Sequence, residues 1–130
     1  MPENTNEFPK RERLCNKKAI TSLFESGESC FVFPLKIYYK SNNLTINRIL
    51  ISIPKRAHKN AVDRNLLKRW IKESWRSGNR GVFEGMDIAV VYISSSLTEF
   101  YKIDKSLSDG LAKIKAALDK NSHTTSNITD

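Results

Sequence analysis

Residues 48–77 read RILISIPKRAHKNAVDRNLLKRWIKESWRS, which predicts a strand, a basic loop and a long helix in succession. Isoleucine recurs at every second position of Arg48–Ile53, the spacing of side chains on one face of a strand. Pro54 ends the strand because proline has no N–H to donate to a sheet. The helix is expected from Asn60 to Ser77, and Gly78 is well placed to end it.

The predicted helix is amphipathic at about 100° per residue. Its apolar side chains occupy one arc, which is expected to pack on a sheet, with Trp75 at the border: Val62, Leu66, Leu67, Trp70 and Ile71. The opposite arc is basic and polar: Arg64, Asn65, Lys68, Arg69, Lys72 and Arg76. Like charges four residues apart destabilise a helix by about 0.2–0.5 kcal/mol per pair. A polyanion lying along this arc would turn the repulsion into attraction, so the pattern favours nucleic-acid binding.

Two further helices and one buried strand are expected around this stretch. A helix is predicted at Lys17–Ser26, with Asn16 as its N-cap and Gly27 at its end. Met86–Ile93 is almost entirely apolar, as in a strand covered on both faces. The last helix is predicted at Phe100–Lys120.

Phe31–Lys40 alternates in two sets, which predicts one strand followed by a turn at residues 41–43. Pro34 within this strand implies an edge position, a strand start or a bulge. One set is expected to face the core: Phe31, Phe33, Leu35, Ile37 and Tyr39. The other set mixes Tyr38 with lysine. The predicted order is therefore α-β-β-α-β-α, an α+β fold with helices packed on a small sheet in a split βαβ arrangement.

The chain of 130 residues with a net charge of +8 suits one basic domain at residues 10–120. Residues 1–9 and 121–130 are polar and are expected to be disordered tails. Lysine and arginine concentrate in residues 10–18 and 55–80. Such sorting is typical of a nucleic-acid footprint rather than of a surface that is merely soluble.

The sequence offers no catalytic or metal-binding constellation. Cys15 and Cys30 are not in a CxxC pair, and they are expected to be reduced thiols. The histidines, His58 and His123, have no partner residues at the spacing of a metal site or a nucleophilic triad. No signal peptide or membrane-spanning run is apparent, so a cytoplasmic protein without membrane contact is expected.

The basic stretch resembles the signature of the bacterial ribonuclease P protein family. A basic pair, Lys55-Arg56, ends a strand, and the helix carries Asn60-Ala61-Val62, Arg64-Asn65 and Lys68-Arg69. The chain departs from the pattern at Leu66, where the family usually has an arginine. Arg11, Arg13 and Leu14, the spacing of Phe24 and Gly27, and the aromatic Tyr38 agree with the family as well.

The resemblance implies a protein without catalytic residues that assists an RNA enzyme. Its partners would be ribonuclease P RNA and precursor tRNA, and the RNA subunit would position the Mg²⁺ ions that hydrolyse the 5′ leader. The implied RNA-binding residues are Arg11, Arg13, Lys55, Arg56, Lys59, Asn60, Arg64, Asn65, Lys68, Arg69, Lys72 and Arg76. A cleft for the single-stranded leader would be lined by Ile20, Phe24, Lys36 and Tyr38. The resemblance also implies a left-handed strand–helix–strand crossover, against the usual right-handed preference.

Two other functions share some of these features. A ribosomal or other structural RNA-binding protein would need the basic helix but not the aromatic cleft. A DNA-binding module would read the major groove with the same helix. The DNA reading is disfavoured, because the apolar arc is committed to the sheet and no preceding helix completes a helix-turn-helix.

Overall fold

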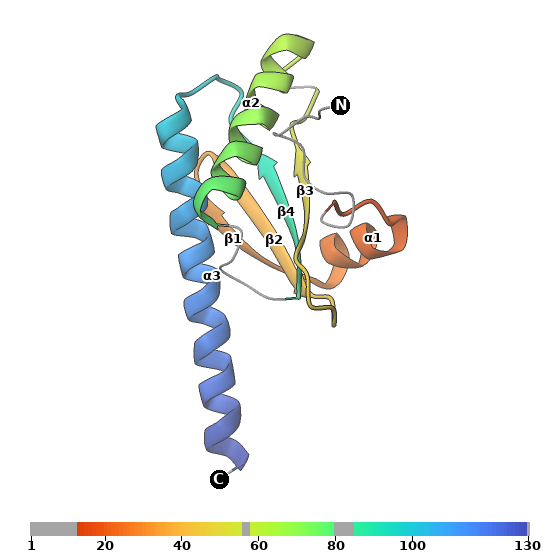
Figure 1. Ribbon diagram of the computed structural model, residues 1–130, viewed down its shortest axis with the longest axis vertical. Coiled ribbons are helices and arrows are strands. Elements are labelled where there is room, and N and C mark those ends of the chain that lie inside the picture. The colour runs from red at the N-terminus through yellow and green to blue at the C-terminus, as the bar shows by residue number, and fades with distance from the viewer. Residues whose placement is uncertain (1–12, 56–57, 80–84, 130) are drawn as a thin grey trace.

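The computed structural model describes residues 13–55, 58–79 and 85–129. Four strands form one mixed sheet in the order β1-β2-β4-β3: β1 Glu28–Val32, β2 Leu35–Ser41, β3 Arg48–Ser52 and β4 Met86–Tyr92. Helix α1 (Lys17–Ser26) packs on one face (Figure 1). The other face is covered by α2 (Ala61–Ser74), its π-helical continuation η2 (Trp75–Asn79) and α3 (Phe100–Thr129). The predicted α+β class is confirmed.

Helix α1 has the predicted bounds because local signals define both of its ends. The Asn16 side chain accepts a hydrogen bond from the Ala19 N–H at 3.0 Å, as an N-cap does. At the other end, the Gly27 N–H donates to the Leu23 carbonyl. Leu23 is fully buried against the sheet, so apolar packing holds the helix in place while the two caps define its ends.

The strand predicted at Phe31–Lys40 is wrong, because the chain turns back within it. β1 and β2 pair as an antiparallel hairpin in which Val32 lies opposite Leu35, and the Phe33–Pro34 peptide bond at the turn is cis. Proline has no N–H for a continuous ladder, so the strand breaks there. Phe31 and Phe33 are consequently 59% and 63% exposed instead of buried. Beyond the turn, the predicted core residues Leu35, Ile37 and Tyr39 are buried.

The crossover through α2 joins two neighbouring parallel strands. β3 pairs parallel to β4, while β2 pairs antiparallel to the other edge of β4. β4 is thus an inner strand that is paired along both edges, and helices pack on both of its faces. Ile88, Ala89 and Val90 are fully buried, as predicted for this apolar run. The order α-β-β-β-α-β-α contains one more strand than predicted. The left-handed sense of the crossover stays a prediction.

The main core lies between the sheet and the helices α2 and α3. The helices contribute large apolar side chains to this core: Leu67, Ile71, Trp75, Ile103, Leu107 and Leu111. Val62 was predicted to face this core, but it is 71% exposed. The reason is visible in Figure 1, where the first turn of α2 projects beyond the end of the sheet. Leu66 and Trp70 are only half-buried. The side of α2 that faces the core is therefore rotated about the helix axis relative to the predicted apolar arc.

The ends of the two long helices differ from their predicted positions. α2 ends at Ser74, and a π-helical turn follows instead of three more α-helical residues. α3 continues to Thr129 rather than ending near Lys120, so it includes residues that composition assigns to a disordered tail. The sequence after Lys120 contains no proline or glycine to stop a helix. The division into one domain and two tails stays a prediction.

Candidate nucleic-acid interface

The face of the sheet next to α1 carries a row of polar side chains along β2. Lys36, Tyr38 and Lys40 alternate with the buried residues of this strand, as predicted. Across the sheet, Lys36 lies opposite Val91, Tyr38 opposite Ala89 and Lys40 opposite Asp87. α1 lies beside this row and leaves part of it accessible (Figure 1).

Three of the four predicted cleft residues meet at this surface. The Phe24 ring contacts the Tyr38 ring edge-on, with centroids 4.7 Å apart. The Lys36 ammonium lies 5.1 Å from the centre of the same Tyr38 ring. Phe24 is 38% exposed, so this "aromatic–lysine surface" of Phe24, Lys36 and Tyr38 offers aromatic rings and a cation to solvent. Ile20 and Tyr38 are both half-buried and both pack against the small apolar cluster under α1, which includes Leu23.

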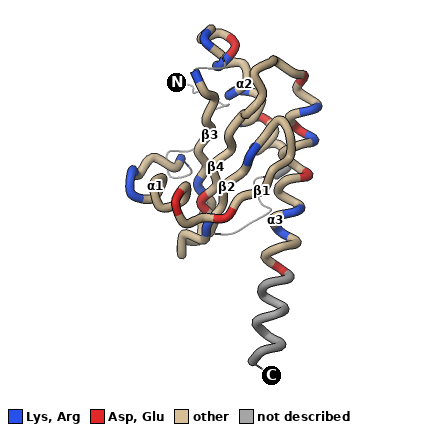
Figure 2. Tube along the Cα trace, turned by 180° about the vertical axis from the view of Figure 1, so that it is seen from behind, with Lys and Arg blue, Asp and Glu red and all other residues tan. Residues whose placement is uncertain are grey.

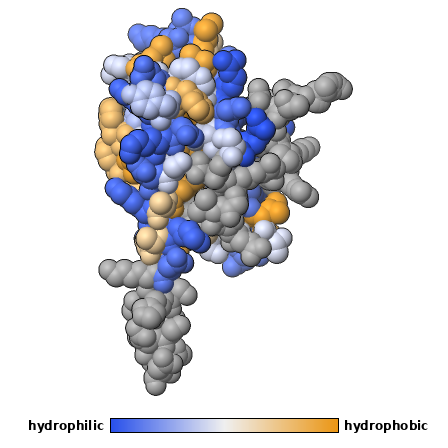
Figure 3. Space-filling view, turned by 60° about the vertical axis from the view of Figure 1, so that its left-hand side comes forward, coloured by the Kyte–Doolittle hydropathy of each residue, from blue (hydrophilic) through white to orange (hydrophobic). Residues whose placement is uncertain are grey.

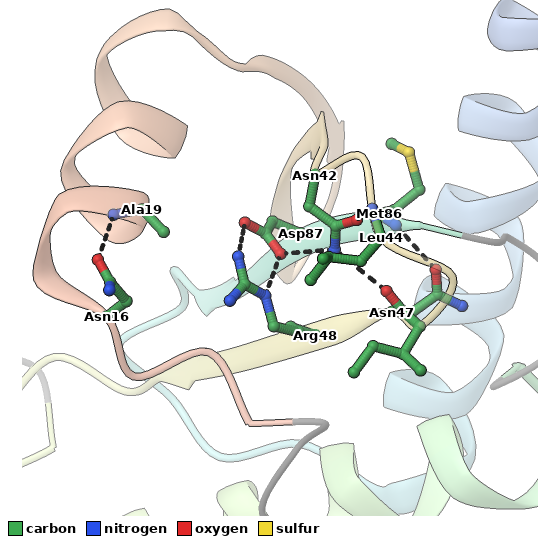
Figure 4. Close-up of polar contacts among 9 residues, drawn as sticks. Asn16, Ala19, Asn42, Leu44, Asn47, Arg48, Met86 and Asp87 are labelled. Carbon is green, nitrogen blue, oxygen red and sulfur yellow. Dashed lines mark hydrogen bonds and ion pairs between the residues drawn. The ribbon is translucent and has the colours of Figure 1, made fainter.

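A largely buried ion pair lies at one end of this sheet face. The Arg48 guanidinium donates to both oxygens of the Asp87 carboxylate at 2.8 and 2.9 Å, and the Asn42 amide adds a third bond at 2.9 Å (Figure 4). The hydrogen bond and charge of Asp87 raise the pKa of Arg48 despite its burial. Nearby, the Lys40 ammonium donates to the hydroxyls of Ser22 and Ser26 on α1.

Sequence reasoning missed this polar end of the face. Lys40 shares the alternation of Lys36 and Tyr38, which was a usable signal. Arg48 and Asp87 are 39 residues apart in the sequence and meet only because β3 and β4 are neighbours. Since Asp87 compensates Arg48, the positive charge available to a ligand lies nearer to Lys36.

The second basic surface follows the solvent side of α2. Asn65, Lys68 and Arg69 are exposed, and Arg64 and Lys72 are half-buried. Figure 2 shows Lys and Arg on α1 and at the end of the molecule where α2 begins. The Asn60 side chain accepts a hydrogen bond from the Val62 N–H at 2.8 Å, so it caps the helix. We call the side chains of Arg64, Asn65, Lys68, Arg69 and Lys72 the "basic helix face".

Arg64 and His58 together hold the loop that leads into α2. One Arg64 nitrogen, Nη1, donates to the carbonyls of His58 and Lys59 at 2.7 and 2.9 Å. His58 is only 5% exposed, and its Nε2–H donates to the Ser94 carbonyl at 2.7 Å, because a carbonyl can only accept. Its ring also packs 5.3 Å from that of Tyr92, whose pKa is raised by burial. The loop is therefore anchored to the segment after β4.

The remaining predicted basic residues lie on this loop, beside β3 and after α2. Lys55 and Lys59 are exposed on the loop. Arg13 is exposed as well, and its main chain forms a bridge with Ile49 at the edge of β3. Arg76 lies at the other end of α2 in an ion pair with Glu73 at 3.0 Å. Arg11 and Arg56 lie outside the described residues.

The two surfaces are separated by the sheet. The aromatic–lysine surface lies on the side of α1, whereas α2 packs on the opposite side through Leu67 and Ile71. Within residues 13–55, 58–79 and 85–129, no three His, Cys, Asp or Glu side chains gather to hold a metal ion. In the same part of the chain, no helix combines the length and apolar character needed to cross a membrane.

Comparison with known proteins identifies relatives along most of the chain. The sequence model of the family described as Ribonuclease P matches residues 8–115. A ribonuclease P protein component of Thermotoga petrophila is 33% identical over 100 residues, which are 77% of this chain and 85% of that protein. Its counterpart from Porphyromonas gingivalis is 25% identical over 115 residues, with 81% of this chain and 84% of that protein covered.

Solved structures of the same kind share the fold. The RNase P protein from Thermotoga maritima superposes with a TM-score of 0.70 at 28% identity, over 79% of this chain and 97% of that one. A mutant RNase P protein from Staphylococcus aureus gives a TM-score of 0.72 at 26% identity, over 82% and 90% of the two chains. With the family match extending over most of its length, this chain belongs to the ribonuclease P protein family, the protein subunits of the ribonucleoprotein enzyme that processes tRNA.

Proposed function

We propose that this protein binds the catalytic RNA of ribonuclease P through the basic helix face and holds the 5′ leader of precursor tRNA on the aromatic–lysine surface. The observation that carries the proposal is the contact of Phe24 with Tyr38 beside the Lys36 ammonium. Aromatic rings stack on unpaired bases without sequence preference, and lysine follows the phosphate backbone. A protein that only scaffolds folded RNA has no need of such a surface.

The basic helix face supplies the affinity for the larger RNA. Each phosphate that lysine or arginine neutralises releases condensed counterions, so binding is strong at low salt and falls as salt rises. The Asn60 cap and the His58 anchor add order, because they fix the start of α2 and the adjacent exposed Lys59 before RNA binds. Arg64 Nη1 holds the loop, and we expect the other N–H groups of this side chain to contact the RNA.

Cleavage itself is assigned to the RNA subunit with its own Mg²⁺ ions, in the cytoplasm. The protein screens the charge of the two RNAs and positions the leader, which lowers the Mg²⁺ concentration needed for cleavage. Mature tRNA lacks the leader and gains nothing from the aromatic–lysine surface. The protein therefore favours precursor over product.

Cleavage of a precursor tRNA with a 5′ extension tests the proposal. A bacterial ribonuclease P RNA is assayed at low Mg²⁺ with and without the protein, and strong stimulation is expected. Changing Lys68 and Arg69 to alanine should reduce the stimulation, and the matched control Lys113→Ala, on the exposed side of α3, should not. Tight RNA binding without stimulation would instead favour a structural RNA-binding role.

A further inference from the structure

One flank of α2 is apolar but only partly covered, with Trp70 packed against the margin of the core. Val62, Leu66 and Trp70 follow one another at helical spacing, and they are exposed or half-buried. This strip runs alongside the exposed Arg69. Figure 3, which brings the side of α3 forward, shows hydrophobic surface among hydrophilic surface over the upper part of the molecule. An apolar strip beside cations fits a ligand that has both flat apolar rings and negative charge.

The strip ends in a pocket between α2 and the start of α3. The pocket is lined by Arg69, Trp70, Glu73 and Phe100. The Trp70 and Phe100 rings lie 6.4 Å apart with their planes at 72°, so they form two walls of an angular corner. Both rings are half-buried, and a planar group can stack on one wall while its edge meets the other.

The two polar residues that line the pocket, Arg69 and Glu73, determine which bases it can bind. Arg69 can contact a phosphate or stack on a base, as the planar guanidinium does. Glu73 accepts a hydrogen bond from Arg76 at 3.0 Å, which compensates its charge next to an RNA. A carboxylate has about four acceptor sites, so Glu73 can accept further N–H groups. Guanine presents two parallel N–H donors on its Watson–Crick edge, which match the two oxygens of a carboxylate.

We propose that this pocket receives one unpaired base of the ribonuclease P RNA, with guanine preferred, stacked at Trp70 and held by Glu73 while Arg69 contacts its phosphate. The inference rests on the proposed function, because the RNA that lies along the basic helix face delivers the base. It adds a base-reading contact to a surface otherwise made of phosphate contacts.

Tryptophan fluorescence tests the pocket directly. The chain has two tryptophans, and Trp75 is only 1% exposed, so Trp70 is the one that a base can reach. Titration with a bacterial ribonuclease P RNA should quench the wild-type signal and leave that of Trp70→Phe unchanged. A U-rich heptanucleotide with one central guanine should quench Trp70 more than the same oligonucleotide with adenine, and Glu73→Gln should remove this preference.

RNA affinity supplies the second readout. Trp70→Ala should weaken binding of the ribonuclease P RNA by about tenfold or more, the usual effect of losing one stacked base, whereas Trp70→Phe should keep most of it. Tyr101→Ala is the matched control, because Tyr101 is an exposed aromatic residue of α3 that does not line the pocket. Thermal melting of each variant shows that it is folded.

The outcomes separate this inference from the proposed function. If the wild-type protein stimulates cleavage but Trp70 is not quenched and Trp70→Ala binds RNA normally, the pocket proposal is overturned and the proposed function stands. If the wild-type protein neither binds the RNA nor stimulates cleavage, both are overturned. Quenching without any preference for guanine contradicts the assigned role of Glu73.

Discussion

Asp87 is a buried charged residue near the start of β4, beside the β2–β3 turn. It is 6% exposed, and Arg48 and Asn42 bond to it from two different segments. Asn42 also donates to the Ile46 carbonyl at 3.1 Å, so the carboxylate is tied to the turn as well as to β3 (Figure 4). A single side chain thus links β4, β3 and the turn that precedes β3.

Replacing Asp87 by alanine is expected to lower the free energy of unfolding by about 3 kcal/mol, because Arg48 is left largely buried without a counter-charge. Urea denaturation measures the change. The double substitution Arg48→Met with Asp87→Leu removes both charges and should recover most of the stability. A double variant as unstable as Asp87→Ala would show that packing, not the unpaired charge, causes the loss.

His58 has a comparable role in the loop before α2. Alanine at this position removes the bond to the Ser94 carbonyl and the packing on Tyr92, which should cost about 1–3 kcal/mol of stability. RNA affinity should fall too, since Lys59 loses its fixed position. Lys59→Ala provides the comparison, with weaker RNA binding at unchanged stability. RNA binding by His58→Ala at wild-type strength would contradict the anchoring role.

At the scale of elements, the sequence predicted the structure best where signals are local. α1 has its predicted bounds because Asn16 and Gly27 act on their own helix. The apolar run of β4 needed only its composition. The hairpin within residues 31–40 was missed because alternation continues across the turn at Pro34. Val62 was misplaced because a helical wheel contains no information on where the sheet ends.

In the candidate site, too, local features were predictable and contacts between distant segments were not. The basic helix face follows from spacing along α2, and the contact of Phe24 with Tyr38 was expected only through the family resemblance. The His58–Ser94 and Arg48–Asp87 contacts join residues 36 and 39 positions apart. Such pairs depend on strand order and register, which periodicity within one element does not specify.

The charge of α2 predicts how RNA binding depends on salt. Lys68→Ala and Arg69→Ala should each weaken binding at low salt, and each should reduce the slope of log K against log salt by about 1, as expected for one lost phosphate contact. Binding isotherms over a series of KCl concentrations measure this slope. Lys113→Ala should leave it unchanged. An equal effect of all three substitutions would mean that net charge, and not the basic helix face, drives binding.

At the scale of the whole molecule, the sheet separates the two surfaces for which we propose different RNA ligands. Tyr38 lies on the α1 side and Lys68 on the solvent side of α2, with the main core between them. The contacts of Tyr38 with Phe24 and Lys36 lie within the first surface, and the Arg64 bonds lie within the loop and helix of the second. We therefore expect the sheet to hold the catalytic RNA and the leader apart without coupling the two binding events.

This separation predicts additive effects. Tyr38→Ala should weaken binding of precursor tRNA to the assembled enzyme while leaving the affinity for the ribonuclease P RNA unchanged, and Lys68→Ala should do the reverse. In the double variant each of these two losses should match that of the single variant within about 0.5 kcal/mol, as for sites without shared partners. A mature tRNA, which has no leader, should bind equally well to wild-type and Tyr38→Ala enzymes. A coupling energy well above that limit would mean that the leader and the catalytic RNA compete for one continuous surface, and the sheet would then be a shared platform and not a spacer.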